Sequence, residues 1–390
     1  MIVRRFLILL VCAAAYGQPD SSRLSLTQVE KLLGDRLTPL AVINRQIQER
    51  GVDFPSSEEV HQQLKALHIA PATWDLIVKF GPPAKWEMLR RSAPNIVRVA
   101  ASGGMLLATD RTNEINISTD YGEHWSSSTV TTLPLEIDSV ASCGKSWVAI
   151  GRENGKIHLF VSDDGKSWIE TKIWDLSTRY WTRSPTPLTC NGDRITVATE
   201  TAVMSSHDSG KSWDLLQNGM ATAIFIGVSF LDSIIHVQES SEDGSQLYDR
   251  YHYCFQEPGN QPVCRGAILY DPVSIVRSGD GVCVGGELGV SVSFNQGKSW
   301  TDQDPPRRNN DDGLNVNTVN DLFLLDTHVL AATKYGGIQF SDSDCDSWTN
   351  LGETAPDNAS SIAVDDTYIY AGTNAGVYRL TRTALPGDKQ

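Results

Sequence analysis

The sequence has no Cys-x-x-Cys pair and no group of histidines at metal-ligand spacing, although it contains seven cysteines and eight histidines. Structural zinc sites take four such ligands at short, regular spacings, so we expect no bound metal and no cofactor. Beyond the first 17 residues there is also no apolar run of the roughly 20 residues that cross a bilayer. We therefore expect no transmembrane segment.

Basic residues are outnumbered, with 33 Lys and Arg against 47 Asp and Glu, which gives a net charge of −14. A surface with this excess of carboxylates repels phosphate groups. Nucleic acids and anionic lipids are therefore disfavoured as partners.

Residues 1–17 have the pattern of a secretory signal peptide. Arg4 and Arg5 form a basic end, an apolar run follows from Phe6 to Ala15, and cleavage is expected near Gly17. The apolar run is too short to span a membrane. A lipoprotein signal around Cys12 is disfavoured because a valine precedes it where a small residue is needed. Cleavage leaves 31 basic and 47 acidic residues, a net charge of −16. We predict a secreted or periplasmic protein.

Five short stretches repeat the pattern Ser-x-Asp-x-Gly-x-Ser/Thr-Trp. Their tryptophans are 43, 45, 87 and 48 residues apart, so the gap of 87 corresponds to two periods with one copy worn away. A period near 44 residues is typical of propeller blades that contain four short strands each. The repeat therefore predicts a β-propeller.

Each copy of the pattern suits a turn between two strands. The Asp side chain accepts from backbone N–H groups, the glycine supplies a positive φ, and the tryptophan packs between neighbouring hairpins. We expect these residues to stabilise the fold without contacting a ligand. They are Asp120, Gly122, Trp125, Asp163, Gly165, Trp168, Asp208, Gly210, Trp213, Asn295, Gly297, Trp300 and Trp348.

The pattern closely resembles the Asp-box, or BNR repeat, of sialidases, sortilin-type receptors, xyloglucan-degrading glycosidases and the photosystem II stability/assembly factor family. The resemblance implies that the boxes lie on the turn between the third and fourth strands, on the face away from the ligand. Overall, the chain is most similar to the single exported propellers of the assembly-factor type, which bind proteins and are not enzymes. This similarity covers residues 84–382 at the level of the repeats.

Strands of alternating apolar residues recur seven times, and residues 234–239 supply the unit that has lost its box. The last unit, residues 360–382, has three strands, and residues 85–91 resemble the strand after each box tryptophan. Such an N-terminal strand would close the ring and remove an exposed edge. We predict an all-β fold, a seven-bladed β-propeller over residues 84–382, followed by a tail at 383–390.

Residues 18–83 instead contain the residue patterns that are typical of helix starts and helix ends. Capping boxes start at Thr27 and Ser56, and Gly34, Gly51 and Gly81 suit helix ends. We expect a small α-helical unit of three or four helices that either caps the propeller or tethers it to something else.

Six cysteines follow the signal peptide, and an even number in an exported protein permits disulfides. Cys254 and Cys264 flank a turn in the blade without a box and are the expected pair. Cys143 and Cys190 hold similar positions in adjacent blades and are a weaker candidate pair. Cys283 lies on an apolar strand and is expected to be a buried free thiol.

The face opposite the boxes is the expected ligand face, because its loops are held by a rigid scaffold. Several of its turns carry carboxylates that suit cation binding or glycoside chemistry, or that simply form a solvated rim. One blade connection concentrates aromatics and arginines, which suits sugar stacking or a protein hot spot, although its tryptophans equally suit the core between blades. The ligand contacts predicted from these segments are Trp174, Arg179, Tyr180, Trp181, Arg183, Arg111, Arg152 and Lys334.

Two functions remain open at this point. A sialidase-like site demands three arginines, an acid/base Asp and a Tyr–Glu pair, and its first arginine lies in an Arg-Ile/Leu-Pro motif that is absent at residues 97–100. The residues that would have to build it are Asp110, Glu200, Glu287, Tyr335, Arg98, Arg183 and Arg277. We therefore predict a monomeric, non-enzymatic scaffold that binds a protein or glycan partner on the face opposite the boxes. The alternative is a sialidase-like glycoside hydrolase.

Overall fold

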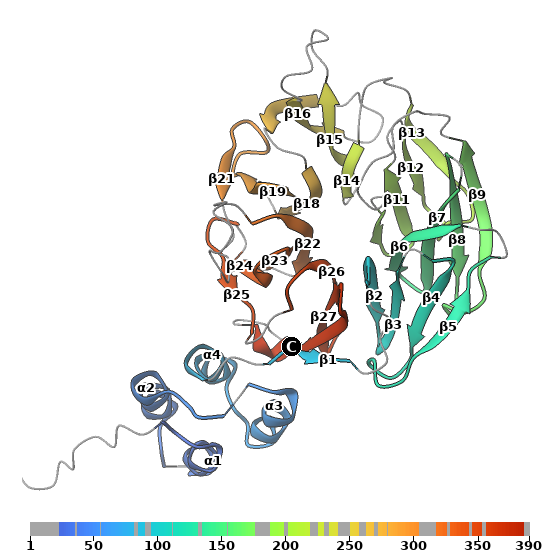
Figure 1. Ribbon diagram of the computed structural model, residues 1–390. Helices are drawn as coiled ribbons and strands as arrows, with labels where there is room; N and C mark the ends of the chain where they lie inside the picture. The colour runs from blue at the N-terminus through green and yellow to red at the C-terminus, as the bar shows by residue number, and fades with distance from the viewer. Residues whose placement is uncertain are drawn as a thin grey trace, which may run out of the picture. The chain divides into compact units, whose positions relative to one another are not determined.

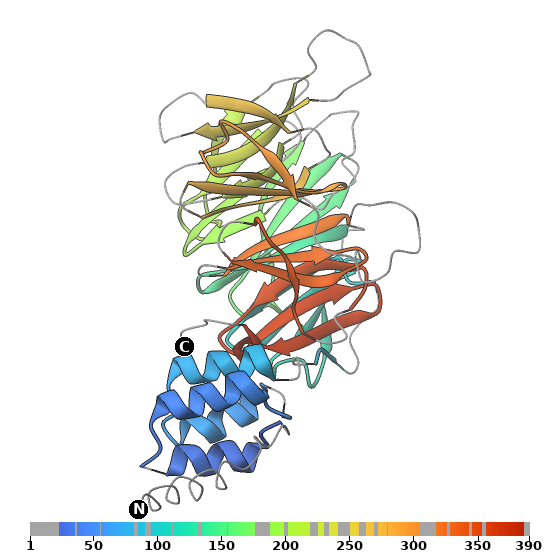
Figure 2. The same cartoon turned by 90° about the vertical axis from the view of Figure 1, so that its left-hand side faces the viewer.

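The computed structural model describes residues 23–385 except 36, 55, 82–84, 90–94, 111, 132–134, 154, 176–187, 199–201, 219–224, 230–233, 241–249, 257–262, 269–271, 279, 304–316, 326–327, 343–344 and 353–355. The chain divides into two compact units (Figures 1 and 2). One unit contains residues 1–84 and 383–390, and the other contains residues 85–382. The predicted signal peptide lies outside the described residues.

The first unit is helical, with α1 (Leu26–Gly34), α2 (Leu40–Arg50), α3 (Glu58–Lys65) and α4 (Pro71–Phe80). The helix starts differ slightly from the sequence prediction. Ser25, not Thr27, forms a capping box with Gln28, and Ser57 rather than Ser56 caps α3. In both cases the cap is the residue whose backbone is extended, which leaves its side chain free to accept an N–H from the first turn.

A core of apolar side chains holds these helices together, including Val29, Ile47, Leu64 and Ile77, each almost fully buried. The C-terminal segment belongs to the same unit. Trp74 Nε1 donates to the carbonyl oxygen of Thr383 at 3.2 Å. Residues near Thr383 therefore pack with the helices, far from them in sequence.

The second unit is a β-propeller made of separate four-stranded antiparallel sheets. Six sheets use four strands consecutive in sequence. The first three are β2 (Arg98–Ser102), β3 (Met105–Thr109), β4 (Glu114–Ser118) and β5 (Ser126–Thr129); β6 (Glu136–Cys143), β7 (Ser146–Glu153), β8 (Lys156–Ser162) and β9 (Ile169–Asp175); and β10 (Leu188–Asn191), β11 (Arg194–Ala198), β12 (Ala202–Ser206) and β13 (Asp214–Asn218).

The next three consecutive sheets are β14 (Phe225–Ser229), β15 (Ile234–Ser240), β16 (Arg250–Gln256) and β17 (Val263–Ile268); β18 (Pro272–Ser278), β19 (Gly281–Gly286), β20 (Gly289–Ser293) and β21 (Thr301–Gln303); and β22 (Val319–Leu325), β23 (His328–Thr333), β24 (Gly337–Asp342) and β25 (Thr349–Asn350). Figure 1 shows these sheets arranged around a common centre. The first strand of each sheet is the innermost, and it contacts the first strands of the sheets beside it.

The remaining sheet combines β26 (Ala359–Val364), β27 (Tyr368–Thr373) and β28 (Gly376–Thr381) with β1 (Glu87–Met88) from the other end of the unit. The prediction of a seven-bladed propeller therefore needs correction. Six blades are continuous in sequence, and this sheet is a composite whose outer strand, within the described residues, is Glu87–Met88 where 85–91 was expected. Its register pairs Glu87 with Arg379 and Met88 with Tyr378, and Leu89 N donates to the carbonyl oxygen of Val377 at 3.0 Å.

The box turns share one hydrogen-bonding geometry in the described copies, and a structural role for them stays a prediction. Ser118 Oγ accepts from Gly122 N at 2.8 Å, and Ser206 and Ser293 repeat this bond to Gly210 and Gly297 at the same distance. The Asp or Asn side chain of the box accepts a second bond in each of these turns, as where Asp208 Oδ1 accepts from Ser212 N at 2.8 Å. These bonds replace the backbone pairs that a tight reversal cannot make.

The second box differs from the prediction. Its stretch from Ser162 to Trp168 is one residue shorter, so Asp164 and not Asp163 takes the acceptor role. Asp164 Oδ1 accepts from Lys166 N at 2.8 Å and Ser167 N at 2.7 Å. Asp163 instead accepts from the Oγ of Ser146, the first residue of β7.

The box glycines are needed because each touches the blade before it. A β-carbon at Gly122 would overlap Leu89, one at Gly210 would lie 2.6 Å from Val161, and one at Gly297 would overlap Tyr253. The fifth box has Cys345 at this position, with φ 57°. Cys345 forms a disulfide with Cys283 of the preceding blade, so a covalent bond occupies the place of the usual glycine contact.

Two disulfides join neighbouring blades, Cys143–Cys190 and Cys283–Cys345, with Cα separations of 5.1 and 6.4 Å. The weaker predicted pair, Cys143 with Cys190, is confirmed. The prediction of a free thiol at Cys283 is wrong, because an apolar strand also accommodates a buried disulfide. Cys254 is disulfide-bonded and lies opposite Cys264 in the β16–β17 register, but the side chain of Cys264 is outside the described residues.

Disulfides persist in oxidising compartments, so these bonds indicate an extracytoplasmic location. Among the helices that the structure describes, none has the length and apolarity to cross a membrane.

Arg379 in β28 fastens the composite sheet. Its guanidinium donates to Glu87 Oε2 of β1 at 2.9 Å, to the carbonyl oxygen of Tyr121 at 2.9 Å and to Glu123 Oε1 at 2.7 Å. It also lies 4.9 Å from the ring centre of Tyr368, and its side chain is only 11% exposed. One side chain thus joins the last strand, the first strand and the first box turn.

We predict that Arg379→Met lowers the free energy of unfolding of the propeller by about 1–3 kcal/mol, because three charge-assisted bonds are lost while the partner carboxylates stay hydrated. Chemical denaturation followed by tryptophan fluorescence measures this. Arg45→Met is the control, since Arg45 pairs with Glu49 on an exposed helix surface and should change stability little. Equal losses for the two variants would contradict a fastening role for Arg379.

The box carboxylates also predict an acid dependence. Hydrogen bonds from the hydroxyl and the backbone N–H of Ser212 lower the pKa of Asp208 to about 2. A depressed carboxylate pKa adds stability that is present above pH 4 and is lost as the pH falls through 2. Asp208→Asn should therefore flatten the loss of stability between pH 4 and 2, as measured by melting temperature.

The fourth box supplies the reverse test, because Asn295 Oδ1 already accepts from Ser299 N at 2.9 Å without titrating. Asn295→Asp should steepen the acid dependence in the same pH window. If neither variant changes the slope, the box carboxylates do not contribute to acid stability.

Candidate functional site

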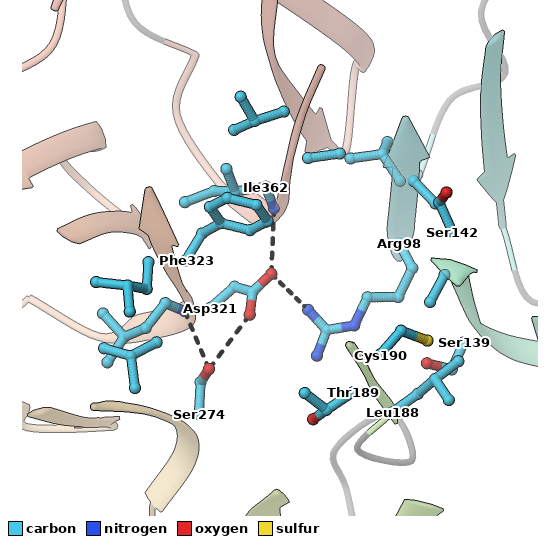
Figure 3. Close-up of a pocket in the computed structure, with 18 of the residues that line it drawn as sticks. Arg98, Ser139, Ser142, Leu188, Thr189, Cys190, Ser274, Asp321, Phe323 and Ile362 are labelled. Atoms are coloured by element: carbon cyan, nitrogen blue, oxygen red, sulfur yellow. Dashed lines mark hydrogen bonds and ion pairs between the residues drawn. The ribbon is translucent and has the colours of Figure 1, made fainter. Parts of the chain in front are cut away.

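The innermost strands enclose a central cavity of about 430 Å³ (Figure 3). Its described lining comes from β2, β6, β10, β18, β22 and β26. Many of these positions carry short side chains, such as Ala100, Ser139, Ala141 and Ala363, which leave space at the centre where larger side chains would fill it. A cavity of this volume lies within the range of small-molecule and peptide pockets.

An ion pair crosses the cavity wall between two blades. Arg98 of β2 and Asp321 of β22 lie 3.0 Å apart, with side chains 15% and 16% exposed. Asp321 Oδ2 also accepts from the backbone N of Ile362 at 3.1 Å, and Ser274 Oγ donates to Oδ1 at 3.3 Å. Figure 3 shows these side chains converging from four different strands.

The same kind of bond recurs around this part of the ring. Ser274 Oγ accepts from Leu322 N at 3.1 Å, and Ser361 Oγ accepts from Val99 N at 3.1 Å. In each case a polar side chain on one innermost strand satisfies a backbone N–H of the next. Asp321 holds the same position as these serines but is ionisable. Burial raises its pKa above the usual range, although the charge of Arg98 works in the opposite direction.

The two arginines that line the cavity lie toward opposite ends of it. Box turns contact the turns that follow the innermost strands, as in the bonds from Tyr121 N to Gly104 O and from Gln296 N to Asp280 O. The innermost strands therefore end on the box side. Arg98 is the first residue of β2 and lies away from the boxes, whereas Arg277 lies near the end of β18 on the box side.

Of the predicted sialidase-like constellation, the described members do not all meet at the cavity, which only Arg98 and Arg277 line. The third arginine, Arg183, lies outside the described residues, as does Glu200. Asp110, Glu287 and Tyr335 lie in turns between second and third strands and do not line the cavity. Asp110 is engaged in its own turn, where its carboxylate accepts from Thr112 Oγ1 at 2.7 Å.

Carboxylates are scarce among the described residues of the cavity lining. Asp321 is the one carboxylate among the described residues of the lining, and it is held by Arg98 and by backbone and hydroxyl donors. Glycoside hydrolysis generally uses two carboxyl groups on either side of the scissile bond. The described geometry gives no such pair.

The predicted ligand contacts have varied environments. Arg152 pairs with Asp138 at 2.7 Å and is mostly buried, while the Lys334 ammonium lies 4.9 Å from the ring centre of Tyr335 in an exposed turn. Trp174 belongs to β9 and packs edge-on against Trp213 at 5.3 Å between ring centres, so it contributes to the contact between blades. Arg111, Arg179, Tyr180, Trp181 and Arg183 lie outside the described residues.

The comparisons agree with the fold. No protein-family profile matches the sequence, and neither does any curated protein. Among solved structures, the chain resembles YCF48 from Cyanidioschyzon merolae with a TM-score of 0.54 and 15% identity, covering 76% of this chain and 99% of that one. It also resembles YCF48 bound to D1 peptide, with a TM-score of 0.53 and 16% identity, covering 77% and 95%.

A third similar structure, that of the RRP9 WD40 repeats, has a TM-score of 0.57 and 10% identity, covering 77% of this chain and 98% of that one. At these identities the likeness shows the β-propeller fold alone. Propellers with quite different roles share it, so function must be argued from the site.

The Arg98–Asp321 pair generates a prediction. Asp321→Ser places at this position the residue found at 274 and 361, which keeps an acceptor but leaves Arg98 without its carboxylate. We expect a loss of about 3 kcal/mol in unfolding free energy, because an uncompensated charge remains in the wall. Adding Arg98→Ala should recover part of it, as measured by urea denaturation. If the losses of the single variants Asp321→Ser and Arg98→Ala add up to the loss of the double variant within about 0.5 kcal/mol, the two residues act independently.

Proposed function

We propose that this protein is an exported, non-enzymatic scaffold that binds a protein partner on the propeller face opposite the box turns, around the mouth of the central cavity. The observation that carries this proposal is the cavity itself. It is open enough to accept part of a ligand, and its described lining contains one carboxylate, which is already bonded.

The polar side chains of the two faces are engaged differently, and this difference supports the face opposite the boxes as the binding surface. On the box face, hydroxyl and carboxylate groups form the hydrogen bonds that close the turns, and the glycines pack against the preceding blade. On the other face, the turn of Lys334 and Tyr335 presents an exposed lysine from a rigid hairpin. Binding residues are commonly placed on such turns.

A peptide is a reasonable class of ligand. One similar structure is YCF48 bound to D1 peptide, so a propeller of this size and fold accommodates a peptide in at least that protein. The segment from Trp174 to Arg183 starts in the last two residues of β9 and adds aromatics and arginines, which are enriched in binding hot spots. We propose it as part of the same surface, although Trp174 itself packs between blades.

Two exposed lysines in equivalent settings test the choice of face. Lys334 lies in a turn between second and third strands, and Lys211 lies in a box turn. A library of peptides should be screened against the wild type by fluorescence polarisation, and the binders titrated with Lys334→Ala and Lys211→Ala. We expect Lys334→Ala and Trp181→Ala to weaken binding at least fivefold, and Lys211→Ala to leave it unchanged.

The reverse ranking would place the binding surface on the box face and contradict the proposal. Turnover of fluorogenic sialosides by the wild type, abolished by Glu287→Gln, would show that the protein is an enzyme instead. Circular dichroism spectra of all variants establish that they are folded.

A further inference from the structure

The two disulfides join blades in the same way but differ in their surroundings. Cys283 and Cys345 are 3% and 0% exposed and lie in an apolar cluster with Val290, Val292 and Trp348. Cys143 is also fully buried, but its partner Cys190 is only half-buried and lines the central cavity. Figure 3 draws Cys190 among the side chains of the cavity wall.

We propose that Cys190 Sγ is a site of thiol–disulfide exchange, open to small thiols that enter the central cavity. Exchange requires a thiolate to reach one sulfur of the bond, so access decides which disulfides react. The cavity, at about 430 Å³, gives a small dithiol room to enter. This inference is independent of the proposed binding function.

The charges of the wall favour the reactive form of such a thiol. The described charged residues of the lining are two arginines, Arg98 and Arg277, and one carboxylate, that of Asp321, which is paired with Arg98. A net positive surrounding stabilises a thiolate relative to a thiol. The protein as a whole is acidic, so the cavity differs from the general surface.

The exchange proceeds in two balanced steps. A thiolate of a dithiol attacks Cys190 Sγ, the Cys143–Cys190 bond breaks, and Cys143 leaves as a thiolate that takes up a proton. The second thiolate of the reagent then displaces Cys190 from the mixed disulfide. The protein bond is reduced to two thiols, and the dithiol is oxidised to a cyclic disulfide.

Reduction at this position would release a link between two innermost strands. Cys143 ends β6, and Cys190 belongs to β10, so the bond joins neighbouring walls of the cavity. The Cys283–Cys345 bond, in contrast, lies between the β19 strand and a box turn, away from the described cavity lining. The Cys283–Cys345 disulfide, which is buried in an apolar cluster, is therefore a control within the same molecule.

The test is a time course of native protein in dithiothreitol, quenched with iodoacetamide and mapped by mass spectrometry. We expect alkylation at Cys143 and Cys190 at least tenfold faster than at Cys283 and Cys345, while the circular dichroism spectrum remains native. Equal rates, earlier release of Cys283 and Cys345, or release only at the rate of unfolding would each overturn the proposal.

Two single variants provide an independent measurement. Cys143→Ala leaves Cys190 as a free thiol at the cavity, and Cys283→Ala leaves Cys345 as a free thiol in the sealed cluster. With folded protein, 5,5′-dithiobis(2-nitrobenzoate) should react with the first variant at least tenfold faster than with the second. A Cys190 thiol that reacts only after denaturant is added would show that the cavity does not admit the reagent and would refute the site.

Discussion

The propeller depends on side chains that bridge neighbouring blades. Each blade is a separate sheet, so the backbone ladder that holds strands together within a blade stops at its innermost strand. The buried N–H groups on that strand still need acceptors. Ser274, Asp321 and Ser361 supply them by reaching from one innermost strand to the next. Because short polar side chains do this work, the ring is held together without filling its centre.

The need for close contact between neighbouring blades also explains why the glycine position of the box carries glycine in some copies and Cys345 in another. A box turn must approach the preceding blade so closely that a β-carbon would overlap its side chains, as Gly297 shows against Tyr253. Cys345 breaks this rule with a positive φ and a side chain. It fits because its sulfur bonds to Cys283 of the blade that would otherwise be in its way. Contact between blades is thus achieved either by removing a side chain or by joining two of them.

The sequence was sufficient for the propeller and the box turns, because both come from a local pattern repeated at a fixed period. It failed where the outcome depends on residues far apart in the chain. The role of Asp164 was missed because a one-residue deletion shifts the second box. The Cys283–Cys345 bond joins residues 62 positions apart, and the closing strand β1 pairs over only two residues. Asp321 was missed because an isolated Asp at the start of an apolar strand carries no motif, and only the folded ring places Arg98 beside it.

The wall that holds the ring together also limits what the cavity can do chemically. Catalysis by a carboxylate needs a group that is free to give or take a proton at the substrate. Asp321 is instead occupied by Arg98, Ser274 and the backbone of Ile362, and each of these contacts belongs to a different strand. Releasing it for chemistry would loosen the junction of several blades. Asp321 is therefore committed to closing the ring in the described part of the wall.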